Sequence, residues 1–198
     1  MNAPCPAETL DRFLASREVL TLATASERGP WCAAVYYVHR RNRFYFFSGE
    51  ASRHVTEALP GGARCAASVS AGGGADWREI RGAQMEGAVT RVGPGREWFG
   101  AVARFLLKFP FAKAFLKDPD IRAFRRRAGR DVHLYRFEAG RVVFTDNREG
   151  FGSAARREFR PAPDGTLSEC GSETSSGRFK RKEIEVKGLS QRRQDAKK

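Results

Sequence analysis

Three apolar segments rich in β-forming residues follow one another near the start of the chain, and they constrain the fold more than any other feature. They cover residues 19–25 (VLTLATA), 31–38 (WCAAVYYV) and 43–48 (RFYFFS). Only short turns, residues 26–30 (SERGP) and 40–42 (RRN), separate them. Turns this short join antiparallel strands, because a parallel crossover needs a dozen or more residues. The sequence therefore favours an antiparallel sheet over a parallel one.

Further strands and helices are expected along the next hundred residues. Gly82 and Gly87 lie inside a long β-rich segment and indicate bulges where a barrel curves. The turn Ala139-Gly140 is expected to join the two closing strands. Strands are predicted over 64–70, 80–92, 132–138 and 141–145, and helices around 10–14, over 53–59 and over 96–115. The predicted fold class is mainly β (α+β), a small antiparallel barrel of about six to seven strands with flanking helices.

Length and charge predict one domain with a basic tail. The 198 residues fit one ordinary domain and a remainder, and 41% hydrophobic residues with 15 Phe are enough for a core. The 36 Lys and Arg against 23 Asp and Glu give a formal charge of +13. Apolar residues are scattered beyond residue 155. We therefore expect a domain over 1–155 and a disordered basic tail over 156–198.

Cysteine usage and hydropathy indicate the compartment. The four cysteines lie far apart without a CxxC pair, so neither a metal site nor a disulfide framework is expected. Cys32, inside a predicted strand, is expected to be a small buried residue. No secretory signal is recognisable, and charged residues interrupt the longest apolar stretch, 98–116, so no membrane span is expected. These features predict a cytoplasmic protein.

The segment 45–59 (YFFSGEASRHVTEAL) carries the most suggestive local chemistry. A strand ending in Ser48 runs into a helix start that carries Ser52, Arg53 and His54. Hydroxyl groups, free backbone N–H groups and a guanidinium group together suit a phosphate. The alternative interpretation is that Ser52 is an ordinary N-cap and Arg53 a solvated surface residue.

Five ordered blocks carry a resemblance that covers roughly residues 8–155. They are Trp31-Cys32-Ala33, Ser52-Arg53-His54, Ile80-Arg81-Gly82-Ala83-Gln84, Phe109-Pro110-Phe111-Ala112 and residues 144–152 (FTDNREGFG). With the order of helices and strands, they make the chain resemble the pyridoxamine 5′-phosphate oxidase-like FMN-binding split barrels. Within that superfamily the chain is most similar to the YhbP-type branch.

The resemblance implies a homodimer with FMN at the subunit interface and an unassigned oxidoreductase role. It also implies a set of cofactor-binding residues. His54 stands where the oxidases have a lysine, and their closing Arg-Leu-x-Pro segment is absent, so oxidation of pyridoxamine phosphate is not expected. The reductant and the catalytic residues stay unassigned. The implied FMN contacts are Ser48, Ser52, Arg53 and His54 at the phosphate, Ala33, Ala34 and Val35 along the flavin, and Arg81 from the long strand.

Two other functions stay open at this point. Arginines between residues 122 and 130, and the basic residues of 178–198, could neutralise the phosphates of a nucleic acid without reading its sequence. The barrel could also have lost FMN and act as a binding module, because fold does not fix function. A flavoprotein would be yellow when purified, whereas a nucleic-acid binder would release its ligand in high salt.

Overall fold

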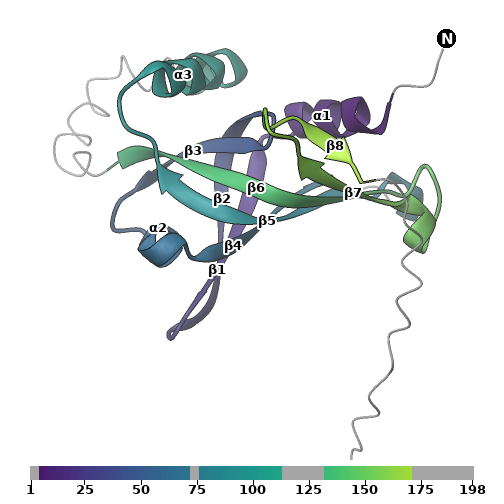
Figure 1. Ribbon diagram of the computed structural model, residues 1–198, viewed down its shortest axis with the longest axis horizontal. Coiled ribbons are helices and arrows are strands. Elements are labelled where there is room, and N and C mark those ends of the chain that lie inside the picture. Colours follow the sequence, from purple (N-terminus) through teal and green to yellow (C-terminus); the bar gives the residue numbers. More distant parts are fainter. Residues whose placement is uncertain (1–4, 72–75, 113–131, 171–198) are drawn as a thin grey trace, which may run out of the picture.

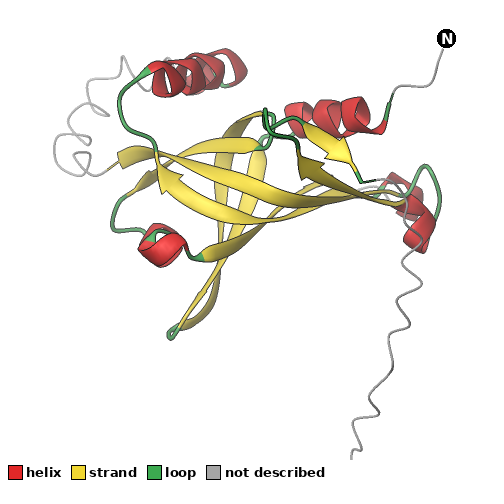
Figure 2. Ribbon diagram, in the orientation of Figure 1, coloured by secondary structure: helices red, strands yellow, loops and turns green. Residues whose placement is uncertain are grey.

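The computed structural model describes residues 5–71, 76–112 and 132–170, in which eight antiparallel strands form one sheet (Figures 1 and 2). The strand order is β3-β2-β1-β4-β5-β6-β7-β8, and a further pairing of β3 with β6 closes the first six strands into a ring. The predicted fold class, an antiparallel split barrel with flanking helices, is confirmed. The strands are β1 (Val19–Ser26), β2 (Gly29–Arg40), β3 (Arg43–Gly49), β4 (Arg64–Ala71), β5 (Arg81–Arg91), β6 (Val132–Asp146), β7 (Arg156–Pro161) and β8 (Leu167–Glu169).

The longest strand, β6, differs from the prediction. A turn at Ala139-Gly140 was expected, but β6 runs through both residues without a break. The register with β5 shifts there, so that Gly87 lies opposite Ala139 while Glu86 lies opposite Arg141. The extra residue is accommodated as a β-bulge, which bends the strand instead of reversing it. Gly87 permits the close approach, since a Cβ atom there would lie 2.2 Å from a carbonyl oxygen of β6.

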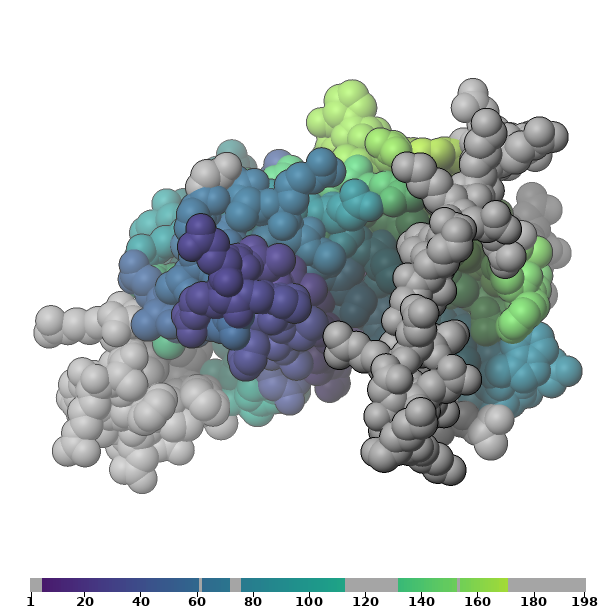
Figure 3. All heavy atoms as spheres, turned by 90° about the horizontal axis from the view of Figure 1, so that it is seen from below, coloured from purple at the N-terminus to yellow at the C-terminus, as the bar shows by residue number. Residues whose placement is uncertain are grey.

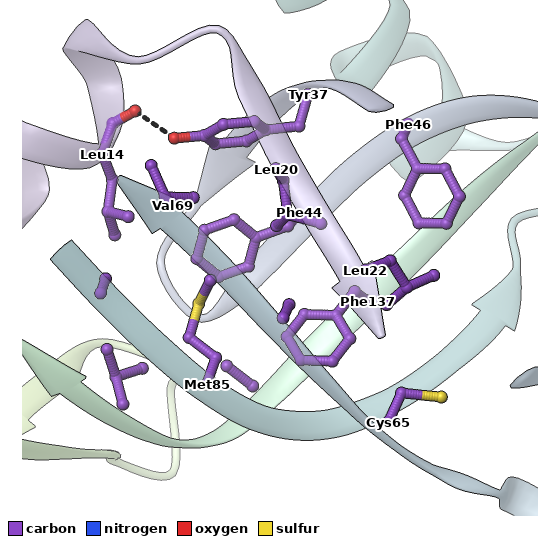
Figure 4. Packing of buried hydrophobic residues seen from close by; sticks show 14 of the residues in the cluster. Leu14, Leu20, Leu22, Tyr37, Phe44, Phe46, Cys65, Val69, Met85 and Phe137 are labelled. Carbon is purple, nitrogen blue, oxygen red and sulfur yellow. Dashed lines mark hydrogen bonds between the residues drawn. The ribbon is translucent and has the colours of Figure 1, made fainter. Parts of the chain in front are cut away.

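Strand alternation fills the barrel interior. Phe44 and Phe46 of β3 and Phe137 of β6 are fully buried and belong to one core cluster (Figure 4). The first helix, α1 (Pro6–Ser16), adds three apolar side chains to this cluster. Tyr37 fastens α1 to the barrel, because its hydroxyl donates a 2.6 Å hydrogen bond to the carbonyl oxygen of Leu14 (Figure 4).

A second, smaller apolar cluster lies under α3 (Arg96–Lys108), outside the barrel. Residues Ala101, Phe105 and Phe109 pack there against Val38 of β2 and other outward-facing side chains of β3 and β6. The helical region predicted over 96–115 is interrupted at Phe109: α3 ends at Lys108, residues 110–112 are helical again, and 113–115 lie outside the described residues. The described residues also contain α2 (Arg53–Ala58) and the 3-10 turns Pro60–Gly62, Trp77–Glu79 and Gly152–Ala155.

The barrel sheet continues past the expected domain boundary. Strand β7 pairs with β6 and β8 pairs with β7, so the same sheet extends to Glu169. Phe159 and Leu167 bury their side chains in the main core. The expected end at residue 155 is therefore too early, because two buried apolar residues bind this charged segment to the sheet. Residues 171–198 of the expected tail, and the arginines of 122–130, lie outside the described residues.

Within the described ranges, no helix is both long enough and apolar enough to cross a membrane.

Candidate functional site

The junction between β3 and α2 brings three predicted residues together. The Ser48 hydroxyl donates to Ser52 Oγ at 3.2 Å, and Ser48 Oγ shares a 2.8 Å hydrogen bond with His54 Nε2. Ser52 stands at the N-cap position of α2, yet its side chain makes no capping hydrogen bond. All three side chains are partly buried. We call Ser48, Ser52 and His54 the junction cluster. Its side chains form hydrogen bonds with one another, and none of them caps the start of α2.

Burial sets the protonation of the junction cluster. Desolvation lowers the pKa of His54 below its usual 6.5, because a buried imidazolium loses its hydration. The imidazole is therefore neutral near pH 7. It offers hydrogen bonds but no positive charge to a ligand.

Arg53 faces away from the junction cluster and connects α2 to the β1–β2 hairpin. Its Nη2 donates to the carbonyl oxygens of Gly29 at 3.0 Å and Arg28 at 3.1 Å, and its guanidinium lies 4.7 Å from the centre of the Trp31 ring. The Nε atom donates to Glu57 at 2.7 Å. Arg53 is thus neither a free phosphate ligand in this structure nor a solvated surface residue.

Glu57 accepts hydrogen bonds from polar side chains of the β1–β2 hairpin. Its carboxylate accepts hydrogen bonds from Thr24 at 2.7 Å and Ser26 at 2.9 Å in addition to the bond from Arg53. These donors, Arg53 first, lower the pKa of Glu57 to about 2. The spacing of Arg53 and Glu57, four residues apart on a helix, was visible in the sequence. The hydrogen bonds from Thr24 and Ser26 of β1 could not be predicted from the sequence, because they depend on tertiary packing.

Polar side chains of β5 and β6 lie next to the junction cluster, and no pattern in the sequence predicts them. His133 is the register partner of Ser48 across the β3–β6 pair. Its Nε2 lies 3.0 Å from Glu50, and Arg91 Nη2 donates to its Nδ1 at 3.0 Å. The hydroxyl of Tyr135, two residues further along β6, is buried without a hydrogen-bond partner among the described residues.

The three residues expected to line the flavin do not share one face of β2. Val35 packs against the barrel core and Ala33 is half-buried, whereas Ala34 is exposed. This follows from the two-residue period of a strand. Cys32 lies on the same side as Ala34 and is exposed, so the expectation of a buried cysteine is wrong.

Arg81 lies apart from the junction cluster within the chain. It begins β5 and pairs with Asp146 at the end of β6, whereas Ser48 pairs with His133 near the start of that strand. The Arg81 guanidinium lies over the Phe13 ring of α1, 5.6 Å from its centre. Within one chain, the structure therefore does not bring Arg81 to the junction cluster, and its contact with FMN stays a prediction.

Comparison with known sequences identifies the family. No protein-family model matches the chain. It is 30% identical over 154 residues to UPF0306 protein plu4501 of Photorhabdus laumondii, which covers 77% of this chain and 95% of that protein. The chain belongs to the UPF0306 family. The UPF0306 protein YhbP of Salmonella arizonae is 27% identical over 149 residues, which confirms the expected YhbP-type branch.

Solved structures share the fold of this UPF0306 protein at low sequence identity. A heme binding protein from Mycobacterium smegmatis superposes with a TM-score of 0.61 at 20% identity, over 81% of this chain and 60% of that chain. This chain thus spans less than two thirds of that protein. HutZ, the heme storage protein from Vibrio cholerae, superposes with a TM-score of 0.52 at 14% sequence identity, over 68% of this chain and 80% of that chain. A FAD-binding protein from Mesorhizobium loti superposes with a TM-score of 0.51 at 14% sequence identity, over 70% of this chain and 92% of that chain.

Proposed function

We propose that this UPF0306 protein binds FMN, with the flavin phosphate held by the junction cluster. The observation that carries the proposal is the convergence of two serine hydroxyls and an imidazole within 3.2 Å at the end of β3. The resemblance to the pyridoxamine 5′-phosphate oxidase-like split barrels and the FAD-binding protein of the same fold support a flavin.

The residues present fit a phosphate group. Phosphate oxygens accept hydrogen bonds, and the Ser52 hydroxyl can donate one directly because it caps no helix. Ser48 and His54 can donate in place of the hydrogen bonds that they make within the cluster. Gly49 keeps this space open, since a Cβ atom there would come within 3.3 Å of Ser52 Oγ. Arg53 contributes by holding α2 against the hairpin, which makes it a positioning residue.

The proposal includes a homodimer that encloses the flavin. From Gly29 to Tyr36, β2 pairs with β1 along one edge, and no described strand pairs with its other edge. Trp31 and Tyr36 are 43% and 48% exposed there. In Figure 3 this β1–β2 hairpin projects toward the viewer. An unpaired edge with exposed aromatic residues suits a second copy of the chain.

A charge on this edge tests the dimer. Ala34→Arg places a guanidinium in the middle of the exposed face and is expected to convert a dimer to a monomer in multi-angle light scattering. The matched control is Ala103→Arg on the exposed face of α3. A monomeric wild-type chain at micromolar concentration would contradict the dimer.

When bound, FMN supplies hydride and electron transfer, whereas the protein supplies position, hydrogen bonds and exclusion of water. In this proposal the junction cluster anchors the phosphate end of FMN. The oxidoreductase role follows from the cofactor, and its reductant is not identified.

Comparison of FMN with riboflavin tests the phosphate site. We expect FMN to bind more than about tenfold tighter than riboflavin in a fluorescence titration, because charge-assisted hydrogen bonds are worth more than about 1.4 kcal/mol together. The double variant Ser48→Ala/Ser52→Ala should remove this preference. Ser70→Ala, an exposed serine on β4, should retain it.

This pair of serines is a better probe than Arg53. Replacing Arg53 would also release the hairpin, so a loss of FMN there would not separate a ligand from a positioning role. Equal affinity of the wild type for FMN and riboflavin would overturn the proposed phosphate site. Binding of hemin without binding of FMN would overturn the flavin itself.

A further inference from the structure

A concave site lies at the opposite end of β3 from the junction cluster. The turn between β2 and β3, the first turns of α3 and Asp164 before β8 line a cavity of about 440 Å³. Figure 1 shows α3 and the β7–β8 hairpin on the same side of the sheet, above β3 and β6. The volume is within the range of small-molecule sites. We call it the arginine pocket, after Arg40, Arg41, Arg43, Arg96 and Arg104 in its wall.

Positive charge dominates the arginine pocket. Its five arginines face two carboxylates, Glu97 and Asp164, which gives a formal charge of +3. Asp164 already pairs with Arg41 at 3.4 Å. No carboxylate of the described residues lies within ion-pair distance of Arg40 or Arg96.

Glu97 is also occupied. Its carboxylate accepts hydrogen bonds from Arg136 and from the Tyr45 hydroxyl, both at 2.8 Å, and lies 3.7 Å from Arg43. The Glu97 carboxylate is thus shared among Arg136, Tyr45 and Arg43, and no ion pair joins it to Arg96 or Arg104 among the described residues. Uncompensated guanidinium groups around a cavity attract anions and match phosphate oxygens as hydrogen-bonding forks.

Hydrogen bonds of Asn42 fix the wall of the arginine pocket. Asn42 is buried, and its Nδ2 donates to the carbonyl oxygen of Ala139 at 3.1 Å. Its backbone N–H donates to Gly165 at 3.0 Å, and its carbonyl accepts from Ala139 at 2.8 Å. These bonds tie the turn to β6 and to the β7–β8 hairpin, so the chain on either side of Asn42 is fixed before a ligand arrives.

The start of α3 adds to the attraction for anions. This 13-residue helix begins after Gly95, which provides no side-chain cap for the first N–H groups. Arg96 stands at its first position and Gly100 leaves space on the next turn. The partial positive charge of the helix start thus acts on the same cavity as the arginines.

We propose that the arginine pocket binds a small molecule that carries two or more phosphate groups. One phosphate group carries about two negative charges and would leave about one positive charge of the pocket uncompensated, whereas a condensed phosphate can match the full +3. The small volume of this concave site favours a small molecule, because nucleic-acid recognition uses an extended surface of about 1,000 Å² or more. The site is separate from the proposed FMN site, since the two lie at opposite ends of β3.

Calorimetric titration with inorganic tripolyphosphate tests the proposal on the full chain with saturating FMN present. We expect one site per chain, and about tenfold weaker binding for Arg40→Gln and for Arg96→Gln, because each removes a charged hydrogen bond. The matched control is Arg64→Gln, whose side chain is 86% exposed, pairs with Glu86 and lies outside the pocket. The control should change affinity less than about twofold.

Four outcomes would overturn the inference. The first is that the wild type does not bind tripolyphosphate. The second is that Arg64→Gln weakens binding as much as Arg96→Gln, which would indicate non-specific attraction by the charged surface. Orthophosphate binds as tightly as tripolyphosphate, which would remove the need for a second phosphate group. A single-stranded oligonucleotide binds more tightly than tripolyphosphate with the same dependence on Arg96, which would make the pocket part of a nucleic-acid surface.

Discussion

Removing the hydroxyl of Tyr37 should loosen α1 from the barrel. Tyr37 is fully buried, and its hydroxyl donates the 2.6 Å hydrogen bond to the carbonyl oxygen of Leu14. In Tyr37→Phe that oxygen keeps only the 3.4 Å bond from the backbone N–H of Arg17. A buried acceptor that loses its main partner costs about 1–2 kcal/mol. For a chain of this size the melting temperature should fall by about 3–6 °C.

Chemical denaturation of Tyr37→Phe beside Tyr36→Phe measures this cost. Tyr36 is the adjacent residue, is 48% exposed and makes no side-chain hydrogen bond within the described residues, so the same chemical change there is expected to be nearly neutral. The two variants should differ by about 1–2 kcal/mol in the free energy of unfolding. Equal stability of the two variants would refute the docking of α1 through this bond.

Two further predictions concern the barrel and the hairpin. Gly87→Ala should destabilise the fold by about 3 kcal/mol in denaturant titration, because its Cβ would lie 2.2 Å from a carbonyl oxygen of β6. Gly140→Ala, whose Cβ would have 3.9 Å of room, should be tolerated, and equal losses would contradict the bulge. Glu57 is bound by Arg53 and has a pKa of about 2 against the usual 4.5, so its stabilising effect is present above about pH 4.5 and is lost as the pH falls toward 2. Glu57→Gln should flatten the acid dependence of the denaturation midpoint, and an unchanged dependence would contradict this.

The sequence was sufficient for the parts of the fold that local patterns determine. The hairpins around residues 26–30 and 40–42 follow from short turns between β-rich segments. The closing strands were harder to predict, because Ala139-Gly140 has the composition of a turn. Its conformation depends on β5, where Gly87 allows the two strands to approach and a bulge to form.

The candidate site was predictable only where its residues are neighbours in the chain. Ser48, Ser52 and His54 come together because one strand runs directly into one helix. The direction of Arg53 depends on the hairpin carbonyls 24 and 25 residues away, which no local pattern reveals. The exposure of Cys32 likewise depends on which face of β2 the barrel covers, and a shift of one residue reverses that face.

The absorption spectrum of the purified chain, after incubation with FMN and removal of the free cofactor, tests the central claim most directly. We expect visible flavin absorption in the protein fraction of the wild type and of Ser70→Ala, and its loss in Ser48→Ala/Ser52→Ala. A wild-type protein that stays colourless after this treatment would contradict the account. Full retention of flavin by the double serine variant would contradict the assignment of the junction cluster.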